Sequence, residues 1–332
     1  MSRSLLPRPA GGGIRRGAPI VMPIQQLRER LRRLIVTMPR RYVVRLGRLL
    51  GDIWWLVDFP RRRTIVRNLK FTHPHLPWAE IRSLTRRIFQ QLGTTVLEIS
   101  QLGFFSKNDI LSSVRAVGAE HFRAAMNGAR GVVLVSAHLG NWEMALQFAA
   151  CYLPAPVLTV AKHMGFKPLD RWLTKVRTHL GARVVFKRGA FSDMAKTVRN
   201  GGVVIVLVDM SRRKEGVDVN FFGRKATATS GAALVALRCQ SPVIPGFCFR
   251  DADGRLTAQF YPAVPIRRTG DLRSDVVVNT QLITDVVERA VREHLDQWCW
   301  YHRKWKKHHP ELYPDFFARR RRRKRRATPA DA

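Results

Sequence analysis

A histidine and a glutamate follow an apolar run in the segment VVLVSAHLGNWEMAL, which extends from Val132 to Leu146. His138 comes just after the run, and Glu143 lies five residues later. On one continuous helix of about 3.6 residues per turn, these two side chains would point in different directions. They can pair if His138 precedes a helix, with Gly140 in a tight turn and Asn141 as the N-cap. Glu143 would then lie in the first helical turn and could reach the imidazole.

This pair of side chains is suited to general acid and base catalysis. A carboxylate beside an imidazole fixes its tautomer and stabilises the imidazolium, so His138 could take a proton from a hydroxyl or an amine. Amides at the start of the helix could stabilise an oxyanion, which favours acyl transfer without a covalent intermediate. The alternative is a buried histidine that is hydrogen-bonded only for structural reasons, and for an isolated H-x4-E pattern this alternative is the common one.

The segments around this motif predict how the two residues are positioned. After Ser112, short runs rich in Val, Ile and Leu alternate with helical patterns. The β-rich runs are GVVLVSA, APVLTVA, ARVVFK, GVVIVLVD and SPVIPGFCF. This alternation predicts an α/β fold with a mostly parallel sheet covered by helices on both faces, preceded by a helical N-terminal region. Because ligands gather at the carboxyl ends of such strands, we expect His138 and Asp209, which both follow strands, at the same edge.

The chain divides into four regions by composition. We expect a disordered basic N-terminus over residues 1–22, a helical, membrane-associating region over 23–110, the α/β domain over 111–310 and a basic disordered tail over 311–332. The stretch YVVRLGRLLGDIWWLVDF has helical periodicity, but Arg45, Arg48 and Asp52 interrupt it. It therefore predicts an amphipathic helix in a lipid interface rather than a membrane span, with packing on the domain core as the alternative.

The charge of the chain points to an anionic partner. Lysine and arginine total 59 against 24 acidic residues, a formal charge of +35. Nucleic acid, anionic lipid and an acidic protein are all candidates. The four cysteines have no CxxC spacing, which favours reduced thiols and indicates no disulfide framework or zinc site. No metal and no cofactor are expected.

The segment AHLGNWE resembles the H-x4-D/E motif of glycerolipid-type acyltransferases, and in particular the bacterial family of late lipid A biosynthesis acyltransferases, the lauroyl and myristoyl transferases. Further segments are similar to that family in the same order, so the resemblance extends from Thr64 to Lys307. These segments are TIVRNLKFTHPHLP, VRAVGAEHFRAA, NGGVVIVLVDM, VNFFGRKATATSGAALVALRCQSPVIP and QWCWYHRKWK.

The resemblance implies that His138 is the catalytic base and Glu143 its partner. It also implies a donor, which is an acyl-acyl carrier protein or an acyl-CoA, and an acceptor, which is a phosphorylated glycolipid of the lipid A precursor type. The residues expected to bind substrate are Arg177, Asp209, Lys162 and, in one loop, Gly223, Arg224, Lys225 and Thr229. The guanidinium of Arg177 suits either a phosphate or the Glu143 carboxylate, and the loop could bind a phosphate. The segment with Trp298, Trp300 and Trp305 would lie at the lipid interface.

The implied location is the cytoplasmic face of the bacterial inner membrane, with an anionic membrane surface as a partner. Met210 and Lys162 depart from the family's usual Gln and Arg, which leaves the acceptor open. A phosphoinositide mannoside or an aminolipid is the alternative acceptor. A non-enzymatic nucleic-acid-binding protein is the alternative of another class, but it gives His138 and Glu143 no role, so no nucleic acid is expected.

Overall fold

The structure is a computed structural model that describes residues 26, 29–30, 33–34, 36–128, 131–186, 189–211 and 216–318. The basic N-terminus expected over residues 1–22 and the run of basic residues from Arg319 lie outside the described residues.

A seven-stranded sheet forms the centre of the described structure, with the strand order β1-β9-β8-β2-β5-β3-β4. Neighbouring strands are parallel except β8 and β9, which are antiparallel. The mostly parallel sheet expected from the sequence is therefore confirmed. The strands are β1 (Val114–Val117), β2 (Val132–Ser136), β3 (Val157–Ala161), β4 (Arg183–Phe186), β5 (Val203–Leu207), β8 (Val243–Arg250) and β9 (Leu256–Phe260).

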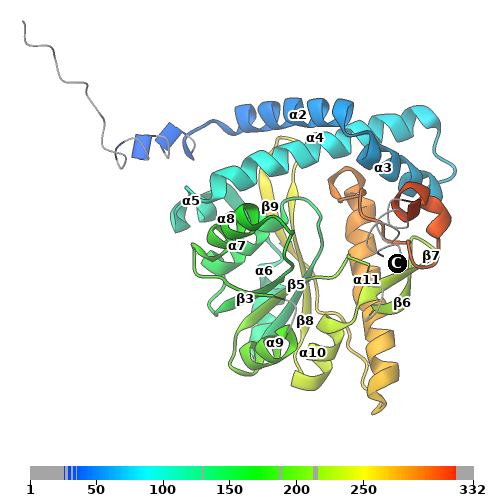
Figure 1. Cartoon of the computed structure of the whole chain (residues 1–332). Coiled ribbons are helices and arrows are strands. Elements are labelled where there is room, and N and C mark those ends of the chain that lie inside the picture. The colour runs from blue at the N-terminus through cyan, green and yellow to red at the C-terminus, as the bar shows by residue number, and fades with distance from the viewer. Residues whose placement is uncertain are drawn as a thin grey trace, which may run out of the picture.

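Helices cover both faces of this sheet (Figure 1). Val133 and Val135 of β2 belong to one buried cluster, whereas Val132 and Leu134 belong to another. The first cluster includes residues of α9 (Ala190–Arg199), α10 (Gly231–Cys239) and α11 (Leu272–Glu293). The second includes residues of α6 (Ala119–Met126), α7 (Trp142–Tyr152) and α8 (Lys167–Thr178). A strand that is buried on both faces needs apolar side chains at every position, which explains the continuous run before His138.

The N-terminal region is helical, with α2 (Arg40–Val57), α3 (Phe59–Thr72), α4 (Trp78–Leu102) and α5 (Lys107–Ser113). Helix α2 lies along α4 (Figure 1). The contact is close because glycines meet there: a Cβ atom on Gly51 would lie 2.3 Å from the carbonyl oxygen of Phe89, and one on Gly93 would lie 2.4 Å from that of Gly47. The narrow glycine face of α2 therefore packs on the protein together with Val43, Val44 and Trp54, and several other large apolar residues of the helix point elsewhere.

Those larger residues of α2 are open to solvent, with between 39% and 66% of each residue's surface exposed. They are Leu46, Leu49, Leu50, Ile53, Leu56 and Val57. The expected amphipathic helix is thus present, and most of its apolar face is not covered by the described part of the protein. Across the described residues, no helix is both long enough and apolar enough to cross a membrane.

The remaining elements are two strands that pack beside α11, a short helix that contacts α4 and α11, and another that contacts α3. They are the antiparallel hairpin β6 (Gly216–Phe221) and β7 (Arg224–Thr229) and the short 3-10 helices η1 (Leu295–Gln297) and η2 (Pro310–Leu312). Packed structure continues beyond residue 310, where the basic tail was expected to begin. Tyr313 is buried, and its hydroxyl donates to Oδ1 of Asn68 in α3 at 2.7 Å.

Candidate active site

The turn that carries His138 is built as a strand-to-helix junction. Gly140 adopts φ +63°, and a Cβ atom there would lie 2.1 Å from the carbonyl oxygen of Cys248, so only glycine fits. Oδ1 of Asn141 accepts from the amide of Met144 at 2.9 Å and caps α7. The glycine turn and the asparagine N-cap expected from the sequence are both confirmed.

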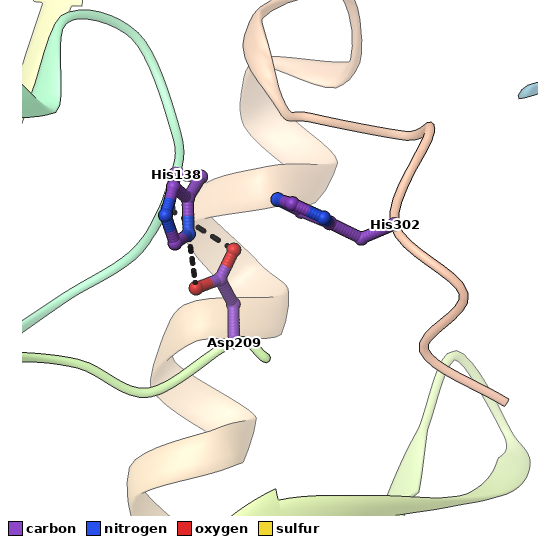
Figure 2. Close-up of side chains that lie close together, drawn as sticks. All are labelled: His138, Asp209 and His302. Carbon is purple, nitrogen blue, oxygen red and sulfur yellow. Dashed lines mark hydrogen bonds and ion pairs between the residues drawn. The ribbon is translucent and has the colours of Figure 1, made fainter. Parts of the chain in front are cut away.

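Asp209 is the hydrogen-bond partner of the His138 ring. Strands β2 and β5 are parallel neighbours in which Ser136 lies opposite Leu207, so the residues two positions further on also meet. Nδ1 of His138 lies 2.9 Å from Oδ1 of Asp209. Figure 2 shows the two side chains facing each other. The backbone amide of His138 donates to Oδ2 of the same carboxylate at 3.0 Å. The second strand end therefore supplies the carboxylate that orients the imidazole.

The charges of this pair stabilise each other in a buried setting. Burial alone would lower the pKa of His138, but the charge and hydrogen bond of Asp209 outweigh it, and the charge of Glu143 adds to them, so the pKa is raised above its ordinary value. Burial would raise the pKa of Asp209, yet the contact with His138 holds it well below its usual range. Asp209 is therefore an ionised carboxylate poised to stabilise an imidazolium.

Glu143 lies in the first turn of α7 as expected, but its side chain bonds to other groups than His138. Nε of Arg177 in α8 donates to Oε2 of Glu143 at 2.8 Å, and a second guanidinium nitrogen donates to Oε1. Nε1 of Trp142 also donates to Oε1 at 3.2 Å. The expectation that Glu143 holds the imidazole therefore needs correction: Asp209 takes that position, and Glu143 acts on His138 through its charge.

The structure gives Arg177 one of its two expected partners and gives Asp209 a different role from the expected one. Arg177 was expected to grip a phosphate or Glu143, and its fork of donors is occupied by the carboxylate. Asp209 was expected to bind substrate, but its side chain is fully buried and accepts from His138 and from Nε1 of Trp298 at 3.0 Å. Both residues therefore belong to the framework around His138.

Several amides that could have formed an oxyanion hole are already bonded. The amide of Gly140 donates to the carbonyl of Gln297 at 3.0 Å, and that of Asn141 donates to the carbonyl of Cys248 at 2.8 Å. The amides of His138 and Met144 bond to side chains, as described above. These four groups fix the turn, so they are not free to bind an oxyanion at the start of the helix.

A buried ion cluster supports the same turn from α4. Oε2 of Glu98 accepts from Nδ2 of Asn141 at 2.7 Å, and the Glu98 carboxylate also pairs with Arg250 and with Arg40. The side chains of Glu98 and Arg250 are 1% and 2% exposed, so both charges depend on this pairing. Sequence reasoning missed Glu98, because nothing near it in the sequence indicates its partners.

The other residues expected to bind substrate are more scattered. Lys162 is exposed just after β3, at the same edge of the sheet as His138. The segment expected to be a phosphate-gripping loop is the β6–β7 hairpin, with Gly223 in its turn at φ +67°. The guanidinium of Arg224 lies over the ring of Phe71, and Lys225 pairs with Asp218. Thr229 ends β7.

The tryptophan-rich segment is part of the core rather than a lipid interface, which corrects a second expectation. Trp298, Trp300 and Trp305 are 0% exposed. Each indole nitrogen has a partner: Trp298 donates to Asp209, Trp300 to the carbonyl of Leu295 and Trp305 to the carbonyl of Phe221. Satisfied indole N–H groups allow such large rings to be buried, and the sequence alone does not distinguish this from an interface.

The same segment brings His302 to the site, which sequence reasoning missed. Its ring lies 5.0 Å from that of His138, edge to face. Nδ2 of Asn68 donates to the carbonyls of Trp300 and His302 and holds this stretch of chain in place. Burial, together with the nearby His138 charge, lowers the pKa of His302 to about 3, so the ring is neutral. His138, Asp209 and His302 offer potential metal-ligand atoms within 4.8 Å of one another.

Comparison with known proteins relates the chain to a family of acyltransferases. A model of the family "Bacterial lipid A biosynthesis acyltransferase" matches residues 27–307. The chain is 27% identical to a phosphatidylinositol mannoside acyltransferase of Mycobacterium tuberculosis, over 57% of this chain and 58% of that protein. It is 25% identical to a lipid A biosynthesis lauroyltransferase of Escherichia coli, over 82% of this chain and 88% of that protein. It is 22% identical to a lipid A biosynthesis acyltransferase of Haemophilus influenzae, over 86% of this chain and 91% of that protein.

Proposed function

Because the chain belongs to the bacterial lipid A biosynthesis acyltransferase family, we propose that it moves a fatty acyl chain from a thioester donor to a hydroxyl of a phosphorylated glycolipid. The observation that carries the proposal is the hydrogen bond between the partly exposed ring of His138 and the buried carboxylate of Asp209, at the ends of two adjacent strands. The family also favours this function over nucleic-acid binding, which would give the pair no role.

In the proposed reaction, His138 acts as the general base. Its Nδ1 is held by Asp209, which leaves Nε2 to take the proton of the acceptor hydroxyl. The oxygen attacks the thioester carbonyl as its proton leaves, and Asp209 stabilises the imidazolium that forms. The tetrahedral intermediate then collapses, the carbon–sulfur bond breaks, and the leaving thiolate recovers the proton from Nε2. No acyl group becomes attached to the protein.

A lipid A precursor is the acceptor we propose, and a phosphatidylinositol mannoside is the second candidate. The longer alignments, with proteins named for lipid A biosynthesis, support the first. The higher identity, to a protein named as a phosphatidylinositol mannoside acyltransferase, supports the second. For the donor we propose an acyl-acyl carrier protein or an acyl-CoA, since both are anionic and the chain carries a formal charge of +35.

We place the enzyme on the cytoplasmic face of the bacterial inner membrane, held by α2. The exposed apolar residues of α2 support this placement, and Arg45 and Arg48 in the same helix could meet anionic headgroups. Leu49→Glu should weaken binding to vesicles that contain anionic phospholipid. The matched control is Val277→Glu, which changes an exposed apolar residue of α11. Equal vesicle binding by both variants would contradict the role of α2.

The direct test is transfer by purified protein. The protein is incubated with a mixture of acyl carrier thioesters and, in separate reactions, with a lipid A precursor or a phosphatidylinositol mannoside, and the products are identified by mass spectrometry. Wild-type protein should add one acyl chain to one of the two acceptors, and His138→Ala should add none while melting at a similar temperature. Transfer by His138→Ala at the wild-type rate would rule out the proposed mechanism.

A further inference from the structure

His302 has an unused ring nitrogen beside the catalytic pair. Its ring points towards His138 and Asp209 from the segment after η1 (Figure 2). Among the described residues, Nε2 of His302 is buried and has no hydrogen-bond partner. An unpaired buried polar atom costs about 1–3 kcal/mol, and a ligand that bonded to this nitrogen would remove that cost.

One carboxylate oxygen of Asp209 also has room for a further partner. Oδ2 accepts two hydrogen bonds, from the amide of His138 and from Nε1 of Trp298. Within the described structure, Oδ1 has one hydrogen-bond partner, Nδ1 of His138. A carboxylate oxygen has two lone pairs, so Oδ1 can bind a further electrophile.

We propose that His138, Asp209 and His302 form a binding site for a divalent transition-metal ion of the Zn²⁺ class, and that the bound ion inhibits the enzyme. Two imidazole nitrogens and one carboxylate oxygen are a ligand set that Zn²⁺ prefers. The three ligand atoms lie within 4.8 Å of one another. Around a tetrahedral Zn²⁺ with bonds of about 2.1 Å they would lie about 3.4 Å apart, so shifts of about 1 Å complete the site.

The groups around the three ligands favour this arrangement. The hydrogen bonds from Trp298 and from the His138 amide fix the Asp209 carboxylate, as second-layer contacts do at metal sites. Asn68 fixes the backbone of His302.

Inhibition follows from the tautomer of His138, and this part of the inference rests on the proposed function. Asp209 normally keeps the ring proton on Nδ1, so that Nε2 can accept a proton from the substrate. Nδ1 is the ring nitrogen beside Asp209, so a metal ion shared with that carboxylate would bind there in place of the proton. The neutral ring then carries its proton on Nε2, which can no longer act as a base.

Binding of the metal alone tests the site. Zn²⁺ is titrated by calorimetry into full-length protein freed of metal with a chelator, and Co²⁺ is followed by its visible absorption. We expect one ion per chain. His302→Phe keeps a ring of similar size and should weaken Zn²⁺ binding at least about 100-fold, since losing even an outer partner of a metal ligand costs about 10- to 100-fold. His308→Phe is the matched control in the same segment, and Mg²⁺, which prefers oxygen ligands, should not compete.

The outcomes separate this site from the proposed function. Absence of Zn²⁺ binding, or equal binding by wild-type protein and His302→Phe, would overturn the site. Full acyl transfer by wild-type protein saturated with Zn²⁺ would overturn the inhibition. Co²⁺ absorption that depends on His302, in a protein that transfers no acyl group, would support the site and count against the proposed function instead.

Discussion

Replacing Asp209 with asparagine should disable the proposed base by reversing the tautomer of His138. Two N–H donors, the His138 amide and Nε1 of Trp298, point at Oδ2 of Asp209. The asparagine amide must therefore place its oxygen there and its NH₂ group opposite Nδ1 of His138. An NH₂ group can only donate, so Nδ1 becomes an acceptor and the neutral ring carries its proton on Nε2. The substrate hydroxyl then meets a ring nitrogen that is already protonated.

The expected loss is large because two effects combine. The wrong tautomer and the missing negative charge beside the imidazolium together should lower kcat by about 10³- to 10⁴-fold, or about 4–5.5 kcal/mol of transition-state stabilisation. The fold should survive, because the amide preserves the shape of the side chain and its bonds to the two donors. The measurement is kcat for acyl transfer from a thioester donor, together with the melting temperature.

Asp285→Asn provides the matched control, since Asp285 is an exposed carboxylate on α11 that bonds to Gln281. It should turn over at the wild-type rate. If Asp209→Asn kept kcat within tenfold of wild type and melted normally, the carboxylate would not orient the base, and the reasoning from Figure 2 would be refuted.

Three further results are expected. The rate should rise with pH through a midpoint above 6.5, because His138 must be neutral to accept a proton and its pKa is raised in the folded protein; a midpoint below 6.5 in kcat/KM profiles would contradict this. Glu143→Gln should move that midpoint to lower pH, because it removes a charge that raises the pKa of His138. The shift should be smaller than the one measured from the remaining activity of Asp209→Asn, since the Asp209 charge acts more strongly on His138. Glu98→Gln should lower the free energy of unfolding by about 3–5 kcal/mol in urea titrations, because it leaves the buried charge of Arg250 without its carboxylate. A loss below about 1 kcal/mol, as is typical of exposed pairs, would show that the cluster is not buried in solution.

The sequence by itself determined the elements and the junction that carries the base. Strand β2 is buried on both faces, so its residues up to Val135 are all apolar, and this continuous apolar run can be recognised in the sequence. Gly140 and Asn141 act through backbone conformation and a cap three residues away, which are also local effects. For the same reason, the periodicity of α2 was sufficient to predict its amphipathic character.

Only the tertiary structure decided which groups meet at that junction. Asp209 reaches His138 because β5, and not β3, lies next to β2 in a register that aligns Ser136 with Leu207. Glu143 pairs with Arg177 because α8 packs beside α7 and brings the Arg177 guanidinium within hydrogen-bond distance of the carboxylate. His302 lies beside His138 although the two residues are far apart in the sequence, and the buried tryptophans belong to the same segment as His302. Strand order and long-range packing depend on the whole chain at once, and no short pattern in the sequence encodes them.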